Sequence, residues 1–402
     1  MKKKVLFVIS TLRCGGAEHA LISLLNVLDY DRYDVDLLVL CQTGMFYRDN
    51  IPKQVHFIEP ELSVRAVLEP NMDNMKECLK TGHWKYIVMH IKRLIKKKIK
   101  PMTVKTNFWS EYWKRYNKYV HPLKTEYDTA IGYLEGLSNY FCIDKVDAKC
   151  KIGWMHTNYL DSKQNYEMDK KYFSKFDKMI TMSEPASETL RKAFPEISNK
   201  IYTMHNVLDE KEVRKLSLEK VDDIEKKDNE VVIVSVGNVL PVKGYDIAVE
   251  ACSKLVEQGK NIKWYVIGRK DQPEKIEEMI KAFHLEEHFF LTGMRKNPYK
   301  YMKMADIYVQ CSRYEGFSTT IREAKLLCKP IVATDCQGIN DQIVSGTNGT
   351  LVTCDADAFF REILELIEQK DILQRYVDAL EVDAQNATET KKDLNKLYEL
   401  MG

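Results

Sequence analysis

Hydrophobic and polar positions follow a repeated order of short apolar strand, glycine-containing loop and amphipathic helix. Residues 5–9 form an uninterrupted apolar run within a predicted strand at 5–10, which is typical of the centre of a parallel sheet. Apolar residues then recur at helical spacing over 20–28, and another apolar strand is predicted at 35–40. This order predicts a doubly wound α/β domain. Its later strands are expected at 129–133, 151–156 and 178–182.

The same order restarts after a charged stretch of low hydrophobicity at 209–229, which predicts a linker. A chain of 402 residues is also longer than one hydrophobic core usually organises. We therefore expect an N-terminal domain over 1–207 and a second α/β domain over 208–380. The second domain has predicted strands at 231–236, 262–267, 289–292, 307–310 and 330–333, with a loop at 237–244 and a helix at 245–255.

A basic, aromatic insertion at about 84–124 interrupts the first domain. From Lys85 to Lys124 the chain carries twelve Lys and Arg residues against a single acid, Glu111, with Trp and Tyr interleaved. A helix is expected at 90–100, with Ile91, Leu94, Ile95 and Ile99 toward one side. One interpretation is contact with an anionic membrane surface, and the other is a solvated basic face over a small local core. Nucleic acid is disfavoured because no recognition motif accompanies the charge. The membrane interpretation assigns the contact to Lys92, Arg93, Lys96, Lys97 and Lys98.

Overall composition adds little to this picture. The net charge of +2 predicts neither a nucleic-acid binder nor an acidic tail. The ten cysteines form no CxxC pair and no cluster with zinc-ligand spacing, so we expect buried thiols in a reducing compartment and no metal site. The N-terminal apolar run is too short for a signal peptide, and no stretch is long enough to cross a bilayer. We expect a cytoplasmic protein, with the membrane contact placing it peripherally on the cytoplasmic face.

The most informative segment follows the strand predicted at 307–310. Open α/β sheets bind ligands at the carboxyl ends of their strands. Glu315 and Gly316 would form the loop there, and a helix would begin at Thr319, so that its N-terminal N–H groups could bind a diphosphate. Gly316 lets a ligand approach the backbone closely. The expected N–H donors are those of Phe317, Ser318 and Thr319.

Carboxylates and cations on the same edge favour a nucleoside diphosphate sugar. Glu315 and Glu323 could accept bonds from different hydroxyls of one elongated ligand. Lys243, in the loop before the first helix of the domain, adds a positive charge for phosphate. Arg295 and Arg313 are further cations on predicted loops.

At this point the chain resembles a known family. Glu315-x7-Glu323, within EGFSTTIREA, resembles the EX7E signature of the retaining GT-B glycosyltransferases called group 1, or family four. GNVLPVKG at 237–244 and the segments 291–317 and 330–352 are similar to the same family. So are three segments of the first domain, GGAE at 15–18, WMHT at 154–157 and MSE at 182–184. The resemblance covers the chain apart from roughly 49–126.

The resemblance implies a GT-B fold, in which two Rossmann-like doubly wound domains face a central cleft. It also implies retention of anomeric configuration and no obligatory metal ion. The nucleoside diphosphate sugar is then a co-substrate, with UDP as the expected nucleotide, and no cofactor is needed. A C-terminal helical segment over 381–402 is expected to return to the first domain.

The resemblance further assigns roles to individual residues. It implies that Glu315 contacts the donor sugar, that Glu323 contacts the ribose, and that Lys243 neutralises the diphosphate as negative charge develops. Gly15-Gly16 would lie near the donor phosphates and the acceptor, and His156 beside the reacting centre. Structural alternatives stay open for two of these, since His156 could be a core histidine and Gly15-Gly16 only a tight turn.

Asn238 departs from the family pattern, because the family commonly has arginine directly after the glycine of this loop. One cation of the diphosphate site is therefore missing from its usual place. Arg295 and Arg313 are the expected replacements.

Together, these features predict transfer of a sugar from a nucleoside diphosphate sugar to a glycan or polyprenyl-linked acceptor. Capsule, lipopolysaccharide or another cell-surface polysaccharide is the expected product. A sugar-nucleotide epimerase on the same fold and a non-catalytic nucleotide-binding protein remain as alternatives. A dinucleotide-dependent oxidoreductase would need a GxGxxG loop, which LRCGGAEH lacks.

Overall fold

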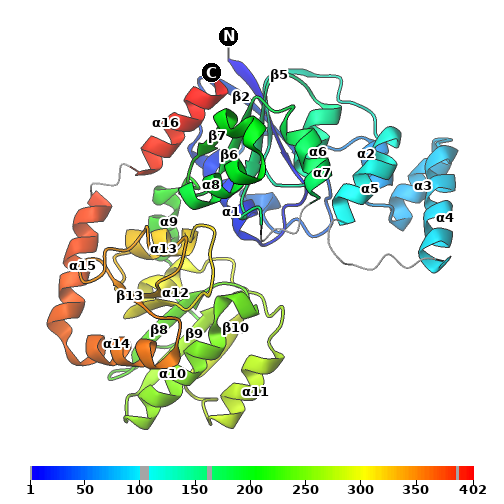
Figure 1. Ribbon diagram of the computed structural model, residues 1–402. Coiled ribbons are helices and arrows are strands. Elements are labelled where there is room, and N and C mark those ends of the chain that lie inside the picture. The colour runs from blue at the N-terminus through cyan, green and yellow to red at the C-terminus, as the bar shows by residue number, and fades with distance from the viewer. Residues whose placement is uncertain (1, 100–107, 161–164, 386–388) are drawn as a thin grey trace. The chain divides into compact units, whose positions relative to one another are not determined.

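The structure is a computed structural model that describes residues 2–99, 108–160, 165–385 and 389–402 (Figure 1). The side chains of residues 96–99, 385 and 389 are outside this description. The chain forms two compact units. The first unit comprises Met1–Val207 and Lys391–Gly402, and the second comprises Leu208–Thr390.

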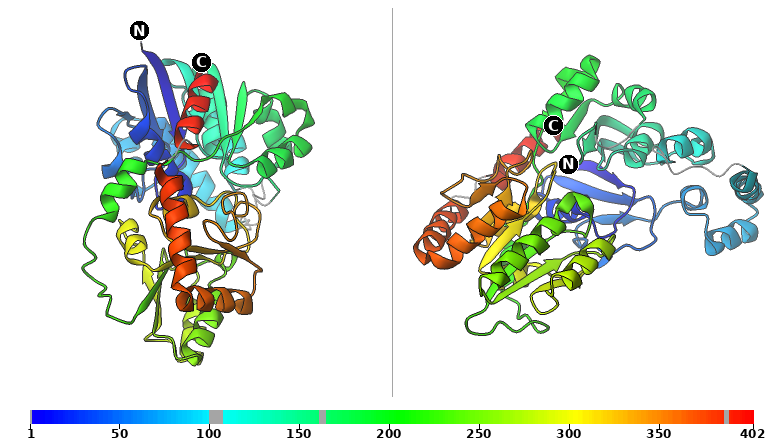
Figure 2. Two further views of the ribbon diagram at one scale, coloured as in Figure 1. Left: turned by 90° about the vertical axis from the view of Figure 1, so that its left-hand side faces the viewer. Right: turned by 60° about the horizontal axis from the view of Figure 1, so that its bottom comes forward.

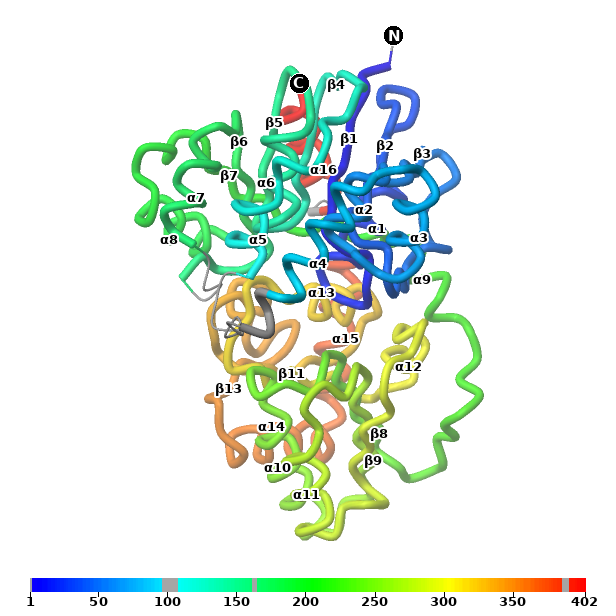
Figure 3. The backbone as a smooth tube through the Cα atoms, turned by 90° about the vertical axis from the view of Figure 1, so that its right-hand side faces the viewer, coloured from blue at the N-terminus to red at the C-terminus, as the bar shows by residue number. Residues whose placement is uncertain are grey.

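The first unit is built on a parallel sheet of seven strands in the order β3-β2-β1-β4-β5-β6-β7, which can be followed in Figure 3. The central strand β1 pairs with β2 on one side and β4 on the other, and Val5 faces Val35 and Thr129. Residues 5–9 are buried, which explains the uninterrupted apolar run. The order of strands reverses direction between β1 and β4. The strands are β1 (Lys3–Ile9), β2 (Tyr33–Val39), β3 (His56–Ile58), β4 (Glu126–Gly132), β5 (Asp147–Met155), β6 (Lys178–Thr181) and β7 (Ile201–Thr203).

The second unit repeats this design with six parallel strands in the order β10-β9-β8-β11-β12-β13. Here the order reverses between β8 and β11, so the loops after these two strands meet at the edge where open α/β sheets bind ligands. The strands are β8 (Val231–Val236), β9 (Ile262–Ile267), β10 (Phe289–Gly293), β11 (Ile307–Gln310), β12 (Ile331–Thr334) and β13 (Thr350–Val352).

Helices cover the sheets of both units. Those of the first unit are α1 (Gly16–Val27), α2 (Leu62–Leu68), α3 (Met72–Lys80), α4 (Trp84–Ile99), α5 (Phe108–Tyr116), α6 (Leu137–Lys145), α7 (Tyr166–Phe173), α8 (Glu184–Ala193) and α16 (Glu389–Met401). Those of the second are α9 (Glu210–Ser217), α10 (Tyr245–Glu257), α11 (Glu274–Ala282), α12 (Tyr299–Met304), α13 (Thr319–Leu326), α14 (Ala356–Glu368) and α15 (Lys370–Gln385).

The basic aromatic segment forms its own small helical layer, with α3 and α4 at the outer end of the first unit (Figures 1 and 2). Helix α4 begins at Trp84, six residues before the predicted start at residue 90. Its buried side chains are Tyr86 and Met89, which join the core together with Trp113 of α5. The face that carries Ile91, Leu94 and Ile95 is exposed instead. The segment therefore packs on the main core of the first unit, and the isoleucine side of α4 is not part of that core.

The charged stretch at 209–229 is not wholly a linker. Helix α9 occupies its first part, with Asp209 as N-cap accepting a hydrogen bond from the backbone N of Glu212. Leu208 and Val213 are buried against Tyr299 and Met302 of α12. Leu216 of α9 packs against the same cluster, so a few apolar residues anchor this helix although the segment around them is polar.

The cysteines are less uniformly buried than expected. Five are buried, four are half-buried, and Cys354 is exposed. All ten are free thiols in the structure.

Helix α16 packs on the sheet of the first unit. Its end is held by a hydrogen bond from Thr129 Oγ1 to the carbonyl of Met401 (3.2 Å). Tyr398 accepts a bond from the backbone N of Asp29 (2.9 Å) and stacks on Tyr33 at 5.4 Å between ring centres. Helix α15 continues to Gln385 within the second unit, past the boundary expected at residue 380.

We predict that Leu397→Ala, in α16, lowers the free energy of unfolding of the first unit by roughly 2–5 kcal/mol. Leu397 is fully buried, so the substitution leaves a cavity. The control Lys392→Ala removes an exposed side chain of the same helix and should change stability by less than about 0.5 kcal/mol. Calorimetry would measure both. An unchanged transition in Leu397→Ala, or after deletion of residues 391–402, would contradict the structural role of α16.

Candidate functional site

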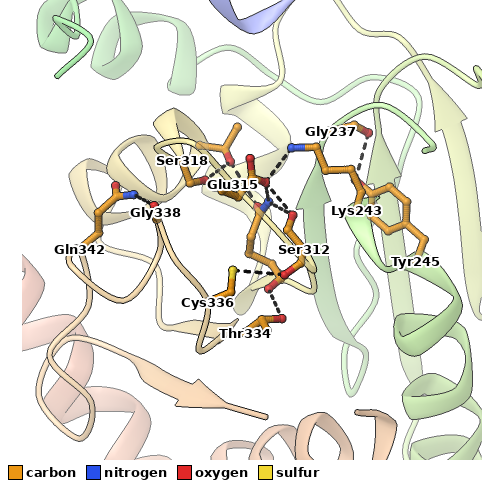
Figure 4. Close-up of polar contacts among 12 residues, drawn as sticks. Gly237, Lys243, Tyr245, Ser312, Glu315, Ser318, Thr334, Cys336, Gly338 and Gln342 are labelled. Atoms are coloured by element: carbon orange, nitrogen blue, oxygen red, sulfur yellow. Dashed lines mark hydrogen bonds and ion pairs between the residues drawn. The ribbon is translucent and has the colours of Figure 1, made fainter. Parts of the chain in front are cut away.

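Two neighbouring strand ends of the second unit bring a cation and a carboxylate together. Lys243 ends a short 3₁₀ turn after β8, and Glu315 lies in the loop after β11 (Figure 4). Lys243 Nζ lies 2.7 Å from Glu315 Oε1. The Lys243 side chain is 23% exposed and that of Glu315 is 13% exposed, so the pair is partly shielded yet reachable from solvent.

The Glu315 carboxylate is fixed by two more donors. Gln310 Nε2 lies 2.8 Å and Ser312 Oγ 2.6 Å from the same oxygen, Oε1. Gln310 is itself held, because its Oε1 accepts bonds from Tyr308 OH (2.7 Å) and Thr320 Oγ1 (3.2 Å). None of the three bonds to Glu315 uses Oε2. The carboxylate is thus oriented by one oxygen and can present the other to a ligand.

Two glycines allow these loops to approach each other. Gly244 has φ of 68°, and a Cβ there would lie 2.0 Å from the carbonyl oxygen of Cys311. Gly338 has φ of 83°, and its Cβ would lie 2.3 Å from the carbonyl oxygen of Glu315. Both positions combine a left-handed backbone with a close contact, so a larger residue at either would push the Glu315 loop away.

The backbone N–H groups before α13 differ from the prediction. Ser318 donates its N–H to the carbonyl of Gly338 (3.2 Å), so this group is already paired. Helix α13 does begin at Thr319, as expected, and Gly316 and Phe317 precede it in the loop. The packing of the Gly338 loop against the Glu315–Gly316 backbone explains the difference, and it was not visible in the local sequence.

Glu323 is a buried acid inside α13. Its side chain accepts a hydrogen bond from Tyr299 OH (3.0 Å) of α12, and the residue is 3% exposed. Burial raises the pKa of Glu323 to about 8, against the lowering influence of the Tyr299 bond and the Arg322 charge. A neutral carboxyl at pH 7 can donate as well as accept, which suits recognition of hydroxyl groups.

The two arginines expected to replace the cation missing at Asn238 are engaged elsewhere. Arg313 makes two bonds to the carboxylate of Asp246, at 2.8 and 2.9 Å, and one to the carbonyl of Pro241. Arg295 pairs with Asp223 at 2.9 and 3.1 Å. Burial raises the pKa of Asp246, but the bonds from Arg313 and Lys275 outweigh it and lower that pKa to about 2. Through its bonds to Pro241 and Asp246, Arg313 stabilises the turn that contains Lys243.

In the first unit, the side chain of Glu18 packs against the Gly15-Gly16 loop. Gly15 is the N-cap of α1. Thr11 Oγ1 donates to Glu18 Oε1 (3.0 Å), and a Cβ on Gly15 would lie 2.3 Å from Glu18 Oε2. Glu18 is thus a first-turn acid that folds back on the loop, and Gly15 makes room for it.

His156 follows β5 and lies between aromatic rings. It stacks on Trp154, with the ring planes 9° apart, and its ring centre lies 4.8 Å from that of Tyr133. Burial lowers the pKa of His156 to about 4, although the nearby Glu135 raises it, so the ring is neutral at pH 7. Both ring nitrogens are buried and have no hydrogen-bond partner among the described residues. The ring is therefore held by aromatic packing.

Glu135 was missed by the sequence analysis. Its Oε2 accepts the backbone N–H of His156 (3.0 Å) and its Oε1 accepts Thr157 Oγ1 (2.8 Å), so it holds the turn that carries His156. A signal for it exists, because Glu135-Gly136 follows β4 as Glu315-Gly316 follows β11. Gln310 and Ser312, which orient Glu315, were likewise missed.

The structure describes only some of the side chains that were predicted to contact a membrane. On α4, Lys92 is exposed, whereas Arg93 donates to Tyr112 OH (3.1 Å) and is half-buried. The side chains of Lys96, Lys97 and Lys98 lie outside the description. Among the described residues, no group of three or more His, Cys, Asp or Glu side chains could hold a metal ion. No helix within the described ranges is long and apolar enough to cross a membrane.

We predict that Glu323→Gln changes the pH dependence of stability. Folded Glu323 keeps its proton up to about pH 8, whereas the unfolded residue loses it near 4.5. The wild-type protein therefore loses stability between these values as pH rises, by up to ~1.4 kcal/mol per pH unit from this group. The variant cannot ionise, so its stability relative to wild type should increase from pH 5 to pH 8.

Urea denaturation at several pH values would measure this difference. Glu278→Gln, on the exposed face of α11, serves as the control and should leave the profile unchanged. A constant difference between Glu323→Gln and wild type across the range would contradict a neutral Glu323.

Comparisons with known proteins agree with this arrangement. The family model for glycosyl transferases group 1 matches residues 218–381, which contain Lys243, Glu315 and Glu323. An uncharacterized glycosyltransferase of Methanocaldococcus jannaschii is 27% identical over 196 residues, which are 46% of this chain and 48% of that protein. The chain thus spans about half the length of this relative.

Two further proteins are similar over the whole chain. The N-acetylgalactosamine-N,N'-diacetylbacillosaminyl-diphospho-undecaprenol 4-alpha-N-acetylgalactosaminyltransferase of Campylobacter jejuni is 23% identical over 405 residues, all of both chains. The crystal structure of Anabaena HepE, in complex with UDP and glucose, has a TM-score of 0.66 at 15% identity and covers 99% of this chain and 98% of its own. This structural likeness confirms the predicted GT-B fold. Residues 218–381, which carry the EX7E pair and most of the switch-point sheet of the second unit, thus match the group 1 family of glycosyltransferases.

Proposed function

We propose that this protein transfers a sugar from a nucleoside diphosphate sugar to a glycan or lipid-linked acceptor, with retention of anomeric configuration. The observation that carries the proposal is the Lys243–Glu315 pair at the β8/β11 switch point, with the carboxylate oriented by Gln310 and Ser312. A cation at this edge suits a diphosphate, and a fixed carboxylate oxygen suits a sugar hydroxyl.

The charged and the neutral side chains of the candidate site would have different roles in the reaction. Lys243 would stabilise the nucleoside diphosphate as it leaves and gains negative charge. Glu315, oriented through Oε1, would accept a hydrogen bond from a hydroxyl of the donor sugar. The neutral Glu323 would form a hydrogen bond with the ribose. His156, uncharged and held by aromatic packing, would offer a hydrogen bond near the reacting centre without adding charge.

We further propose a UDP-sugar as donor and a polyprenyl-linked acceptor, in the synthesis of capsule, lipopolysaccharide or a similar surface polysaccharide on the cytoplasmic side of a membrane. Anabaena HepE was crystallised with UDP and glucose, which supports the donor. The name of the Campylobacter jejuni relative contains a diphospho-undecaprenol, which supports the acceptor.

The exposed face of α4 supports contact with a membrane. Trp84, Val88, Ile91 and Ile95 recur at helical spacing, and their exposed fractions run from 48% to 60%. Lys92 lies among them on the same helix and is exposed. A second copy of the chain would bring like charges together at this face, whereas an anionic bilayer would neutralise them and cover the apolar side chains. We therefore propose that α4 lies on an anionic membrane surface.

The transfer reaction can be tested directly. Purified protein should release one nucleoside diphosphate from UDP-, GDP-, ADP- or dTDP-sugars in the presence of a polyprenyl-linked acceptor. Glu315→Gln and Lys243→Gln should each lower kcat/KM on the order of 10²–10³-fold, because each removes a preorganised group from the site. The control Lys281→Gln, an exposed lysine of α11, should be fully active.

Full activity of Glu315→Gln would refute the assigned role. An altered sugar nucleotide without release of nucleoside diphosphate would identify an epimerase, and binding without any turnover would identify a non-catalytic protein.

The membrane contact predicts sedimentation with vesicles. The protein should bind vesicles that contain phosphatidylglycerol more tightly than neutral ones, and high salt should weaken this binding. The triple variant of Trp84, Ile91 and Ile95 to Ser should bind at least about tenfold more weakly, since each buried apolar side chain contributes ~1.5–3 kcal/mol. Val382→Ser, which removes an exposed apolar side chain from α15, is the control. Equal binding of the triple variant and wild type would exclude α4 as the docking face.

A further inference from the structure

Arg269 lies beside the loop that contains Asn238, in the second unit. It follows β9, the neighbour of β8 in the sheet, so both chain segments leave the sheet at the same edge. The Arg269 N–H donates to Asn238 Oδ1 (3.1 Å), and Val239 donates its N–H to the carbonyl of Arg269 (2.8 Å). These two bonds fix the Arg269 backbone against the loop.

The contact between the two loops is close. A Cβ on Gly268 would lie 2.0 Å from the carbonyl oxygen of Gly237 and 2.9 Å from the N of Asn238. The Lys243 side chain also lies against Gly237, with its Cε 3.5 Å from the position of a Cβ there. Gly237 therefore has the Lys243 side chain and the Gly268-Arg269 backbone as near neighbours.

The guanidinium of Arg269 is not fully satisfied. Nη2 pairs with Asp271 Oδ2 at 3.1 Å, but Nε is buried and has no hydrogen-bond partner among the described residues. Leaving a buried N–H of a charged group unpaired is unfavourable, so such a group marks a place for an acceptor. The side chain as a whole is 39% exposed, although Nε itself is buried. By contrast, Arg313 and Arg295 each form two bonds with one carboxylate.

We infer that Arg269 binds the diphosphate of the donor, next to Lys243, and that Asn238 positions it. This inference rests on the proposed function, since the ligand is the nucleoside diphosphate part of the same donor. A guanidinium has five N–H donors, so Arg269 can keep its bond to Asp271 and still bond to phosphate oxygens. The cation is thus supplied from the loop after β9, while the loop after β8 supplies the amide that holds the Arg269 backbone.

The test compares a nucleoside diphosphate with its nucleoside. Calorimetry with UDP, GDP, ADP and dTDP first identifies the tightest ligand of the wild-type protein. Arg269→Gln should bind that diphosphate about 10–100-fold more weakly and its nucleoside unchanged, because only phosphate contacts are lost. The control Lys270→Gln, at the exposed neighbouring residue, should bind both as wild type does.

A charge-relocation variant makes the test sharper. Asn238→Arg in the Arg269→Gln background places a cation on the adjacent loop and should restore at least tenfold of the lost diphosphate affinity. Wild-type affinity of Arg269→Gln for the diphosphate, or equal weakening of diphosphate and nucleoside, would overturn the inference and leave the proposed function intact. Failure of the wild-type protein to bind any of the four diphosphates would overturn both.

Discussion

The ion pair between Lys243 and Glu315 depends on a constraint of the sheet itself. Their loops follow β8 and β11, which are neighbours in space but separated in the chain by two other strands. Because both strands are parallel, their carboxyl ends meet at one edge, and residues 72 apart in sequence come within 2.7 Å. Gly244 and Gly338 let the loops close on each other, and Gln310 then fixes the carboxylate. The arrangement of the candidate donor site follows from these few contacts.

The titratable groups of the two units divide into paired charges and buried neutral groups. Lys243 pairs with the carboxylate of Glu315, and Arg313 pairs with that of Asp246. Glu323 and His156 are neutral at pH 7, because burial raises the pKa of the acid and lowers that of the imidazole. Neutral groups can recognise hydroxyls without repelling a diphosphate, and charged groups can neutralise it.

Much of the fold could be predicted because apolar residues recur along the chain at the regular spacing of strands and helices. The strands at 231–236 and 307–310 and the start of α13 agree with the structure to the residue. The exceptions depend on tertiary contacts. Val213 and Leu216 anchor α9 within a polar stretch, and the carbonyl of Gly338 accepts a hydrogen bond from the N–H of Ser318. In the site, Glu315, Glu323 and Lys243 carry recognisable motifs, whereas the pairing of Arg313 with Asp246 joins residues 67 apart and leaves no local pattern.

Because of helix α16, the first unit is built from two separate segments of the chain, and this affects the order in which the two units can be completed during synthesis. The second unit is one continuous segment, Leu208–Thr390, whereas the first is completed only by residues 391–402. During synthesis, the ribosome must therefore produce the whole second unit before the first unit receives the helix that bonds to Thr129 and stacks on Tyr33. Domains usually fold as units in the order in which they emerge. Here the later unit can reach its final state while the earlier one still waits for its last element.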